Sequence, residues 1–292
     1  MALDIHLTAL DGAPLPSATV MLLRDAPAGL EVLMMRRHGD SAELGGVYVF
    51  PGGKLDPADL GAPAQHLDRD GEQLRAELAE PETPVDTAVG LYLAALRETL
   101  EECGVLPGAQ VDAAGLAAMR HSLAEGRSLM DALAARGQRA PTASLVPWSR
   151  WITPRLASVT RKRFDTRFFV ARAPADQEAQ HDDHEATEAV WLTPREALQR
   201  YWDGAIDLAP PQIISLSQLA RHTQVDGLLE AARRAGPTLV QPEPHDHEGV
   251  RVICYPGDVR HSVREPVWDG PTRLLHRNGR FEPEGGLATL LP

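Results

Sequence analysis

Three glutamates in one short segment have the types and spacing needed to hold a divalent metal ion. Glu98, Glu101 and Glu102 lie in a stretch that we expect to be helical. At about 100° per residue they share one helix face, where like charges repel by about a few tenths of a kcal/mol per pair. A divalent cation removes this repulsion. Mg²⁺ fits best because it takes hard oxygen ligands, and Mn²⁺ can substitute for it.

A glycine turn upstream provides a second chemical feature. Gly52 and Gly53 follow a short strand predicted over residues 47–50. Without a Cβ the backbone can turn there without a clash and approach a ligand closely. Glutamates alone would more often form a solvated helix face, because glutamate is a good helix former and mostly exposed. The combination of turn and glutamates favours metal-assisted chemistry on a phosphate compound.

The glutamates need a helix that packs on one side only. Thr83 is the predicted N-cap, Pro84 the first helical residue and Gly104 the C-terminal stop. Apolar residues recur between them at steps of three and four, namely Val85, Val89, Tyr92, Leu96, Leu100 and Cys103. This stripe lies opposite the glutamates. The helix can therefore pack on a sheet while its carboxylates point into a cleft.

The rest of the chain alternates between strand and helix patterns, which predicts an α/β layered fold. Residues 56–82 are expected to form an inserted loop with a short helix around 72–78. Asn278-Gly279 is a strong hairpin turn signal in a β-like tail. The other expected elements are strands at 18–23, 30–36, 166–173 and 188–192, two helices within 113–136, one helix opening at Thr193, and helices near 212–220 and 227–234.

Composition and charge exclude several classes of protein. The formal charge of −12 argues against a general binder of nucleic acid or membrane surfaces, which would carry a basic face. No segment approaches the roughly 20 apolar residues that cross a bilayer, and the N-terminus lacks a signal-peptide pattern. Cys103 and Cys254 are the only cysteines, so no disulfide framework is implied. We therefore expect a reducing, cytoplasmic location.

The glycine turn and the glutamate helix match the two halves of the Nudix box, so the chain resembles the Nudix hydrolase superfamily. The family pattern is Gly, five residues, Glu, seven residues, then Arg-Glu-aliphatic-any-Glu-Glu-any-Gly-aliphatic. The residues that match it are Gly53, Arg97, Glu98, Glu101, Glu102, Gly104 and Val105. Thr99 replaces an aliphatic residue. Asp59 stands where the family has its first glutamate, either as a metal ligand or only as part of the turn.

The box is split, because 37 residues separate Asp59 from Arg97 where the family usually has seven. The chain is similar in this to a branch that includes the mammalian peroxisomal coenzyme A diphosphatases, and segments 50–59, 151–154 and 163–169 also resemble that branch. The resemblance implies a Nudix α/β/α sandwich with a mixed sheet over residues 1–204, with a helical insertion at 60–96. It also implies a C-terminal α+β extension over residues 205–292, packed on that domain.

The same resemblance implies Mg²⁺-dependent hydrolysis of a diphosphate linkage in a small nucleoside diphosphate derivative, with coenzyme A or an acyl-CoA as the first candidate. Glu98, Glu101 and Glu102 would hold the metal, and Arg97 would orient a glutamate. The base that takes the proton of the attacking water stays open among four residues, namely Glu101, Glu102, Glu185 and Glu188.

Substrate contacts are expected from the glycine turn and from basic side chains. Gly52 and Gly53 would approach the phosphates, while Arg36, Arg37 and Arg163 would supply positive charge in an acidic protein.

A different class of function is a Nudix-like sensor that binds a nucleotide ligand without cleaving it. Such modules commonly lose the glutamates of the box, so their presence here favours the enzyme. The segment after residue 204 could also serve regulation or formation of a homodimer.

Overall fold

The computed structural model describes residues 9–41, 43–156, 159–180 and 186–292. The strands of its main sheet are β1 (Leu15–Ala26), β2 (Gly29–Arg37), β3 (Tyr48–Val49), β4 (Gly52–Lys54), β5 (Val146–Ile152), β6 (Phe164–Arg172), β7 (Ala186–Leu192) and β8 (Thr238–Val240). Their order is β3-β2-β1-β6-β5-β8, with β4 paired to β1 and β7 to β2. The β1–β6 and β5–β8 pairs are parallel and the β1–β2 pair is antiparallel, so the sheet is mixed as expected.

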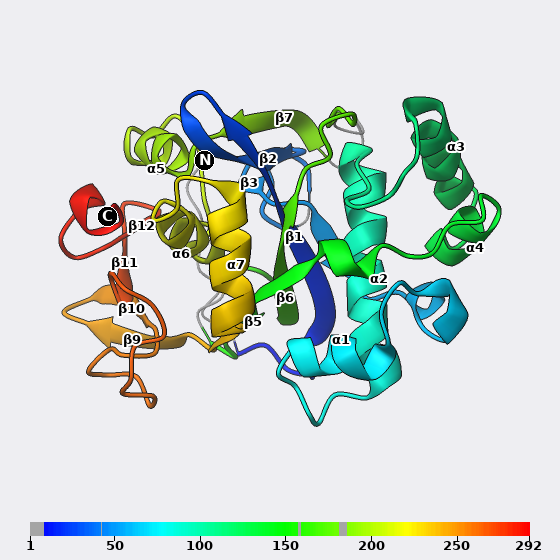
Figure 1. The fold of residues 1–292 in the computed structure, drawn as a ribbon. Helices are drawn as coiled ribbons and strands as arrows, with labels where there is room; N and C mark the ends of the chain where they lie inside the picture. The colour runs from blue at the N-terminus through cyan, green and yellow to red at the C-terminus, as the bar shows by residue number, and fades with distance from the viewer. Residues whose placement is uncertain (1–8, 42, 157–158, 181–185) are drawn as a thin grey trace.

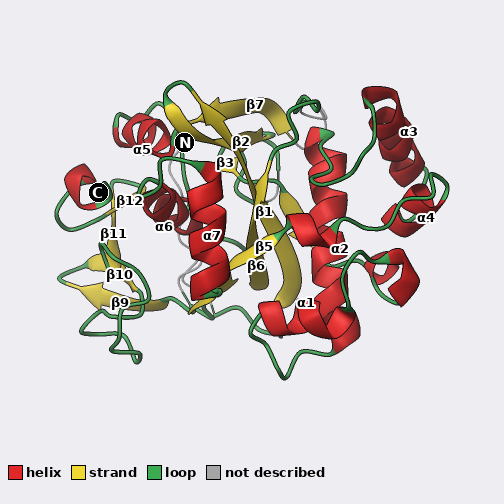
Figure 2. Ribbon diagram, viewed as in Figure 1, coloured by secondary structure: helices red, strands yellow, loops and turns green. Residues whose placement is uncertain are grey.

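Helices cover both faces of this sheet, which confirms the predicted α/β/α sandwich (Figures 1 and 2). One face carries α1 (Gly71–Glu77), α2 (Val85–Cys103), α3 (Ala113–Ala124) and α4 (Leu129–Ala134), and the other carries α5 (Pro194–Trp202), α6 (Pro210–Leu219) and α7 (Val225–Ala235). Successive side chains of β1 point to opposite faces of the sheet, so this strand contributes to the apolar core on each face. Val20 and Leu22 pack into the core around α2, whereas Met21 and Leu23 pack into the core on the opposite face.

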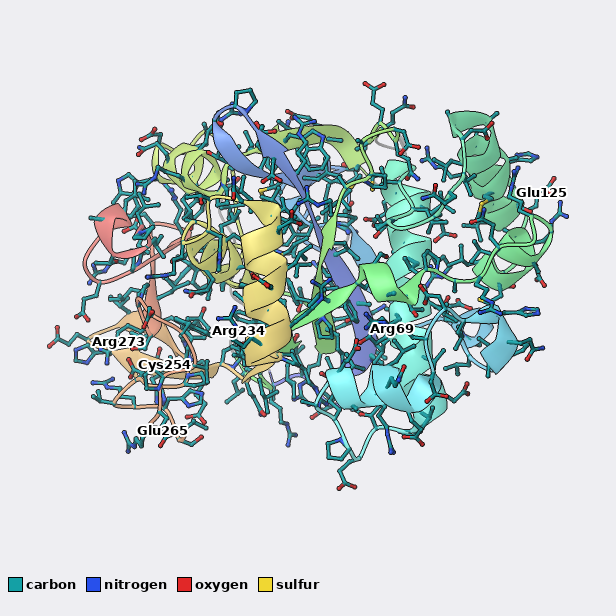
Figure 3. All side chains as sticks on the ribbon, viewed as in Figure 1. Arg69, Glu125, Arg234, Cys254, Glu265 and Arg273 are labelled. Carbon is teal, nitrogen blue, oxygen red and sulfur yellow. The ribbon has the colours of Figure 1, made fainter. Side chains whose placement is uncertain are left out.

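A second, four-stranded sheet lies in the C-terminal part of the chain. It consists of β9 (Glu243–His247), β10 (Val250–Cys254), β11 (Arg273–Arg277) and β12 (Arg280–Glu282), and Figure 3 labels Cys254 and Arg273 within it. The turn between β11 and β12 has positive φ at Asn278 (51°) and Gly279 (73°), which confirms the hairpin signal. Ile253 and Phe281 belong to the same apolar core as Met21. This sheet is therefore packed against the main layers.

The glutamate helix forms almost as predicted. Its apolar stripe is buried from Val89 to Cys103 and half-buried at Val85, and Gly104 ends α2 in the left-handed conformation with φ 69°. The predicted N-cap is wrong by one residue: Pro84 caps α2 without a side-chain bond. The hydroxyl of Thr83 instead donates to Oε2 of Glu80 at 2.8 Å. Strand β5 is not among the predicted elements, because Pro147, Ser149 and Arg150 interrupt its apolar pattern.

Among the described residues, none of the helices combines the length and apolar character that crossing a bilayer requires. Cys103 and Cys254 are both buried free cysteines. A cytoplasmic location and a homodimer remain predictions, as does the domain boundary at residue 204.

The insertion between the two halves of the box is folded against the main domain. Leu67, Leu74 and Leu78 are buried in the core around α2. Glu80 is also buried, and its carboxylate accepts two hydrogen bonds from Arg167 of β6, at 2.9 and 2.5 Å. Arg150 of β5 approaches the same carboxylate at 3.1 Å. These ion pairs fix the insertion to two strands of the main sheet.

We expect Glu80→Gln to lower the free energy of unfolding by roughly 3 kcal/mol, because the buried Arg167 loses one of its two carboxylate partners, the other being Asp165. Urea denaturation monitored by circular dichroism measures this change. Glu72→Gln is the matched control, since Glu72 pairs with Arg75 on the surface of α1 and its loss should cost less than about 1 kcal/mol. Equal changes in the two variants would show that the Glu80 ion pair does not fix the insertion.

Candidate active site

Arg97 joins the two halves of the box through its guanidinium group. Nε and Nη2 each donate to one carboxylate oxygen of Asp59 at 2.9 Å, and Nη2 also donates to the carbonyl of Lys54 at 3.0 Å. Nη1 donates to Glu98 at 2.8 Å and to Glu101 at 2.9 Å. Burial alone would lower the pKa of Arg97, but the bond to Asp59 and the charges of Glu98 and Asp59 raise it above its usual value.

Asp59 serves the turn and the arginine together. It is almost fully buried, at 2% exposure, and ends a 3₁₀ helix formed by Pro57–Asp59. Its Oδ2 accepts the backbone N–H of Asp56 at 2.9 Å, and Asp56 in turn accepts from Ala58, which completes a capping box. Both of its oxygens are engaged by Arg97. Of the two roles considered for Asp59, the structure shows the one at the turn.

Close packing at the two glycines seats the glutamates against β4. A Cβ on Gly53 would lie 2.3 Å from Oε1 of Glu98, so the carboxylate occupies the space that a side chain would need. A Cβ on Gly52 would lie 2.4 Å from the carbonyl oxygen of Ala18 in β1. The N–H of Gly52 donates to Oε2 of Glu102 at 3.0 Å. The predicted glycine turn is thus a short strand that holds two of the three glutamates.

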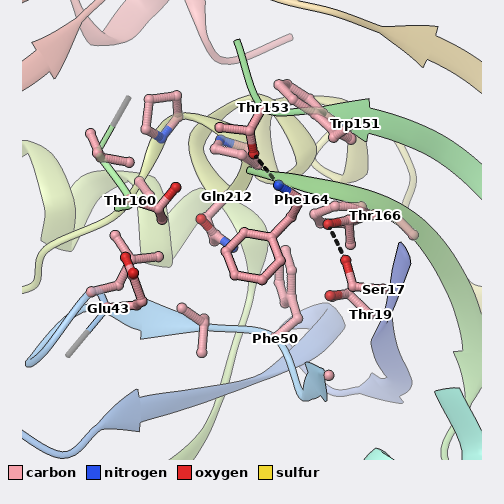
Figure 4. A pocket seen from close by; sticks show the side chains of 18 of the residues that line it. Ser17, Thr19, Glu43, Phe50, Trp151, Thr153, Thr160, Phe164, Thr166 and Gln212 are labelled. Atoms are coloured by element: carbon pink, nitrogen blue, oxygen red, sulfur yellow. Dashed lines mark hydrogen bonds between the residues drawn. The ribbon is translucent and has the colours of Figure 1, made fainter. Parts of the chain in front are cut away.

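A cavity of about 480 Å³ opens beside these glycines, in the size range of small-molecule sites (Figure 4). Gly52, Gly53, Lys54 and Glu98 line it, so the turn and one box glutamate reach it. Its other walls come from distant segments, and the aromatic residues among them are Phe50, Trp151, Phe164, Phe168 and Phe281. None of residues 60–96 lines it. The insertion is therefore not a lid over this cavity.

Of the three arginines expected to contact the substrate, one lines the cavity and two do not. Arg37 lines the cavity, and Arg36, its exposed neighbour on β2, does not. Arg163 donates to the backbone carbonyls of Thr153 and Gly12, both at 3.1 Å, and does not line the cavity either. It braces the β5–β6 connection instead. Lys162, one residue before it, does line the cavity, so the sequence located the segment but not the side chain.

Of the two candidate bases outside α2, Glu188 lies within the described residues. Glu185 lies outside the described residues. Glu188 on β7 accepts a hydrogen bond of 2.6 Å from the hydroxyl of Tyr48 and does not line the cavity. Burial and this bond raise the pKa of Tyr48 to about 12, so its hydroxyl stays protonated and bound to Glu188. Glu101 and Glu102, the two candidate bases on α2, do not line the cavity either. Glu102 accepts the N–H of Gly52 in the turn, and Glu101 accepts a hydrogen bond from Arg97.

The donor chemistry at this turn of α2 suits a hard cation, although the described residues contain no ready-made metal cluster. Within the described ranges, no three side chains of Asp, Glu, His or Cys are grouped so as to hold a metal ion. The reason is local: Arg97 bonds Glu98 and Glu101, while Glu102 turns toward β4. The three groups are nevertheless carboxylates within one helical turn beside a glycine backbone, which is the donor type that Mg²⁺ prefers.

Comparison with a solved structure defines the class of protein. A Nudix hydrolase from Alicyclobacillus acidocaldarius is similar to this chain, with a TM-score of 0.60 and 27% sequence identity. The similarity covers 75% of this chain and 96% of that one. The α/β/α layers and the paired halves of the box are thus those of a Nudix hydrolase.

Sequence comparison gives the family within this class. Acyl-coenzyme A diphosphatase NUDT19 of Xenopus laevis is 26% identical over 300 residues, covering 86% of this chain and 79% of that protein. The protein of the same name from Homo sapiens is 29% identical over 243 residues, covering 70% of this chain and 64% of its own length. The model of the NUDT19 Nudix domain matches residues 8–219. The chain therefore belongs to the NUDT19 Nudix domain family of hydrolases.

We expect Gly53→Ala to reduce turnover by up to about 10²-fold, because the new Cβ would displace the Glu98 carboxylate from β4. That carboxylate is the end of a flexible side chain, so the free energy of unfolding should change by less than about 1 kcal/mol. Steady-state kinetics and urea denaturation measure the two effects. Gly227→Ala on α7 is the control, since no heavy atom lies within 4 Å of its new Cβ. Full turnover in Gly53→Ala would contradict the role given to this contact.

Proposed function

We propose that this protein hydrolyses the diphosphate linkage of a nucleoside diphosphate derivative and that a coenzyme A compound is its substrate. The observation that carries the proposal is that the glycine turn and the glutamate helix both contribute residues to the wall of one cavity. Gly53 and Glu98 both line a cavity of about 480 Å³, although they lie in opposite halves of a split box. A diphosphate at this boundary would meet the carboxylates, while the rest of the substrate would enter the cavity.

Positive charge near the turn suits an anionic substrate. The chain carries a formal charge of −12, so an anion is repelled by the molecule as a whole. Lys54, Lys162 and Arg37 line the same cavity as Glu43 and Glu98, so basic side chains outnumber acidic ones in its lining. The backbone of Gly52 and Gly53 allows close approach because neither residue has a side chain there. These groups would bind and orient the phosphates.

The glutamates of α2 would supply the metal site and the base. Glu98, Glu101 and Glu102 would hold Mg²⁺ or Mn²⁺, which when bound lowers the pKa of water and neutralises charge on phosphate oxygens. Arg97 keeps Glu98 and Glu101 in one orientation through Nη1. Gly52 holds Glu102 through its N–H. A carboxylate fixed in this way can accept the proton of the attacking water, and Glu102 is our first choice.

The choice of substrate depends on the relatives. Those from Xenopus laevis and Homo sapiens are named acyl-coenzyme A diphosphatases, at 26% and 29% identity. Coenzyme A contains a diphosphate between a nucleoside and a long polar arm, so it meets the chemistry expected at the turn. ADP-ribose and NADH share the nucleoside and the diphosphate, and they belong in the same substrate panel as coenzyme A and acyl-CoA.

We expect Glu102→Gln to lower Mg²⁺-dependent turnover by 10²-fold or more, on the scale of removing a general base, while the change from carboxylate to amide leaves the side-chain size nearly unchanged. Release of the two products of coenzyme A cleavage, 4′-phosphopantetheine and adenosine 3′,5′-bisphosphate, measures the effect. Glu101→Gln, assayed in parallel, shows which of the two glutamates acts as the base.

Glu125→Gln is the control, because Glu125 is an exposed glutamate near the end of α3 (Figure 3). Wild-type turnover in both Glu101→Gln and Glu102→Gln would end the proposed mechanism. Binding of the panel compounds without turnover by the wild-type protein would favour a nucleotide sensor instead.

A further inference from the structure

A buried amide without a hydrogen-bond partner lines the cavity from the side of the C-terminal extension. Gln212 stands in the first turn of α6 and is 7% exposed. Its Oε1 makes no hydrogen bond within the described part of the chain. A buried amide left unsatisfied costs about 1–3 kcal/mol, so a partner is expected from outside the fold. Because Gln212 lines the cavity, a bound ligand can provide this partner (Figure 4).

An aromatic residue whose backbone is fixed by hydrogen bonds lines the same cavity. The N–H of Phe164 donates to Oγ1 of Thr153 at 3.0 Å, and its carbonyl accepts the N–H of Thr153 at 2.9 Å. On its other side Phe164 pairs with Leu15 in the parallel β1–β6 ladder. The residue is only half-buried, and across the described residues no other aromatic ring packs against it. Its ring is therefore available to stack on a flat group.

The ring of Phe164 and the amide of Gln212 together suit a ligand group that is flat and carries a donor beside an acceptor. A carboxamide offers one acceptor and one donor side by side, which pairs in bidentate fashion with the amino group and a ring nitrogen of adenine. An aromatic ring adds about 1–3 kcal/mol of stacking per base. We propose that Gln212 and Phe164 form an adenine subsite that selects the nucleoside half of the substrate. This inference rests on the proposed function and extends it to the residues that read the base.

Other occupants fit these observations less well. An acyl chain has no donor for the Gln212 oxygen and would leave it unsatisfied in an apolar site. A slender pantetheine arm has amide N–H groups but no flat face for the ring of Phe164. The cavity also has Lys54 and Lys162 among its lining residues, which places positive charge within the same site as the base for the phosphate of a nucleotide.

The test compares the affinities of two nucleotides that differ by one amino group. AMP and purine riboside 5′-monophosphate are titrated into the full-length protein by calorimetry. The wild type should bind AMP at least about fivefold more tightly, since a bidentate pair discriminates by about 1–3 kcal/mol. Gln212→Leu should reduce this ratio to within about twofold. Because an apolar residue of similar size replaces an unsatisfied polar one, the variant should be as stable as the wild type or more stable.

Two further variants separate the roles. Phe164→Leu should weaken both nucleotides by a similar factor of about tenfold and keep their ratio, because stacking does not depend on the amino group. Ser215→Ala is the matched control for Gln212, since Ser215 is also buried on α6 with an unpartnered hydroxyl but does not line the cavity. It should leave both affinities and their ratio unchanged. Gln212→Met repeats the main measurement should Gln212→Leu fold poorly.

The outcomes distinguish this inference from the proposed function. An AMP preference that survives in both Gln212→Leu and Gln212→Met overturns the adenine subsite. Loss of 4′-phosphopantetheine binding in these variants, with the AMP preference intact, overturns it as well and assigns the cavity to the other half of the substrate. Nucleotide binding needs no turnover, so an AMP preference that depends on Gln212 supports the subsite even where the panel shows no hydrolysis and the proposed function fails.

Discussion

The fork of hydrogen bonds from Arg97 is the constraint on which the active site depends. One guanidinium reaches Asp59, Glu98, Glu101 and the backbone of β4, and so joins segments that 37 residues separate in the chain. A planar group with five donors can satisfy these acceptors at once, which a lysine cannot. Partial burial strengthens these contacts, because water does not compete fully with the carboxylates. The 37-residue segment therefore lengthens the connection between the two halves of the box, while Arg97 keeps the two halves in contact.

The insertion and the extension contribute in different ways. The insertion is held to the sheet by Glu80 and its two arginine partners, and it leaves the cavity open. The C-terminal part lines the cavity through α6 and through Phe281 of the small sheet. One apolar core joins α6 and the small sheet to the main sheet. In the function that we propose, substrate selection would reside in segments outside the box, while the box would supply the chemistry.

The sequence predicted what depends on local pattern. The apolar stripe of α2, its stop at Gly104 and the hairpin at Asn278 all follow from short-range spacing, and the structure contains each of them. Side-chain partners between distant segments could not be predicted in this way. Arg163 braces backbone and Lys162 lines the cavity, although both are basic neighbours in the sequence. No sequence pattern pointed to Gln212 as a binding residue. It stands out because its side-chain oxygen is buried without a hydrogen-bond partner, and only the fold reveals this.

Our central claim is that Asp59 acts on the glutamates through Arg97. A double-mutant cycle in kcat/KM with Asp59→Asn, Arg97→Ala and the double variant tests it most directly, because asparagine keeps a side-chain oxygen for the N–H of Asp56 in the turn. We predict that the double variant is no worse than Arg97→Ala alone, because removing the charge of Asp59 has no further effect on turnover once the arginine is absent. Losses that multiply in the double variant would show that the two residues act independently, and would contradict this account.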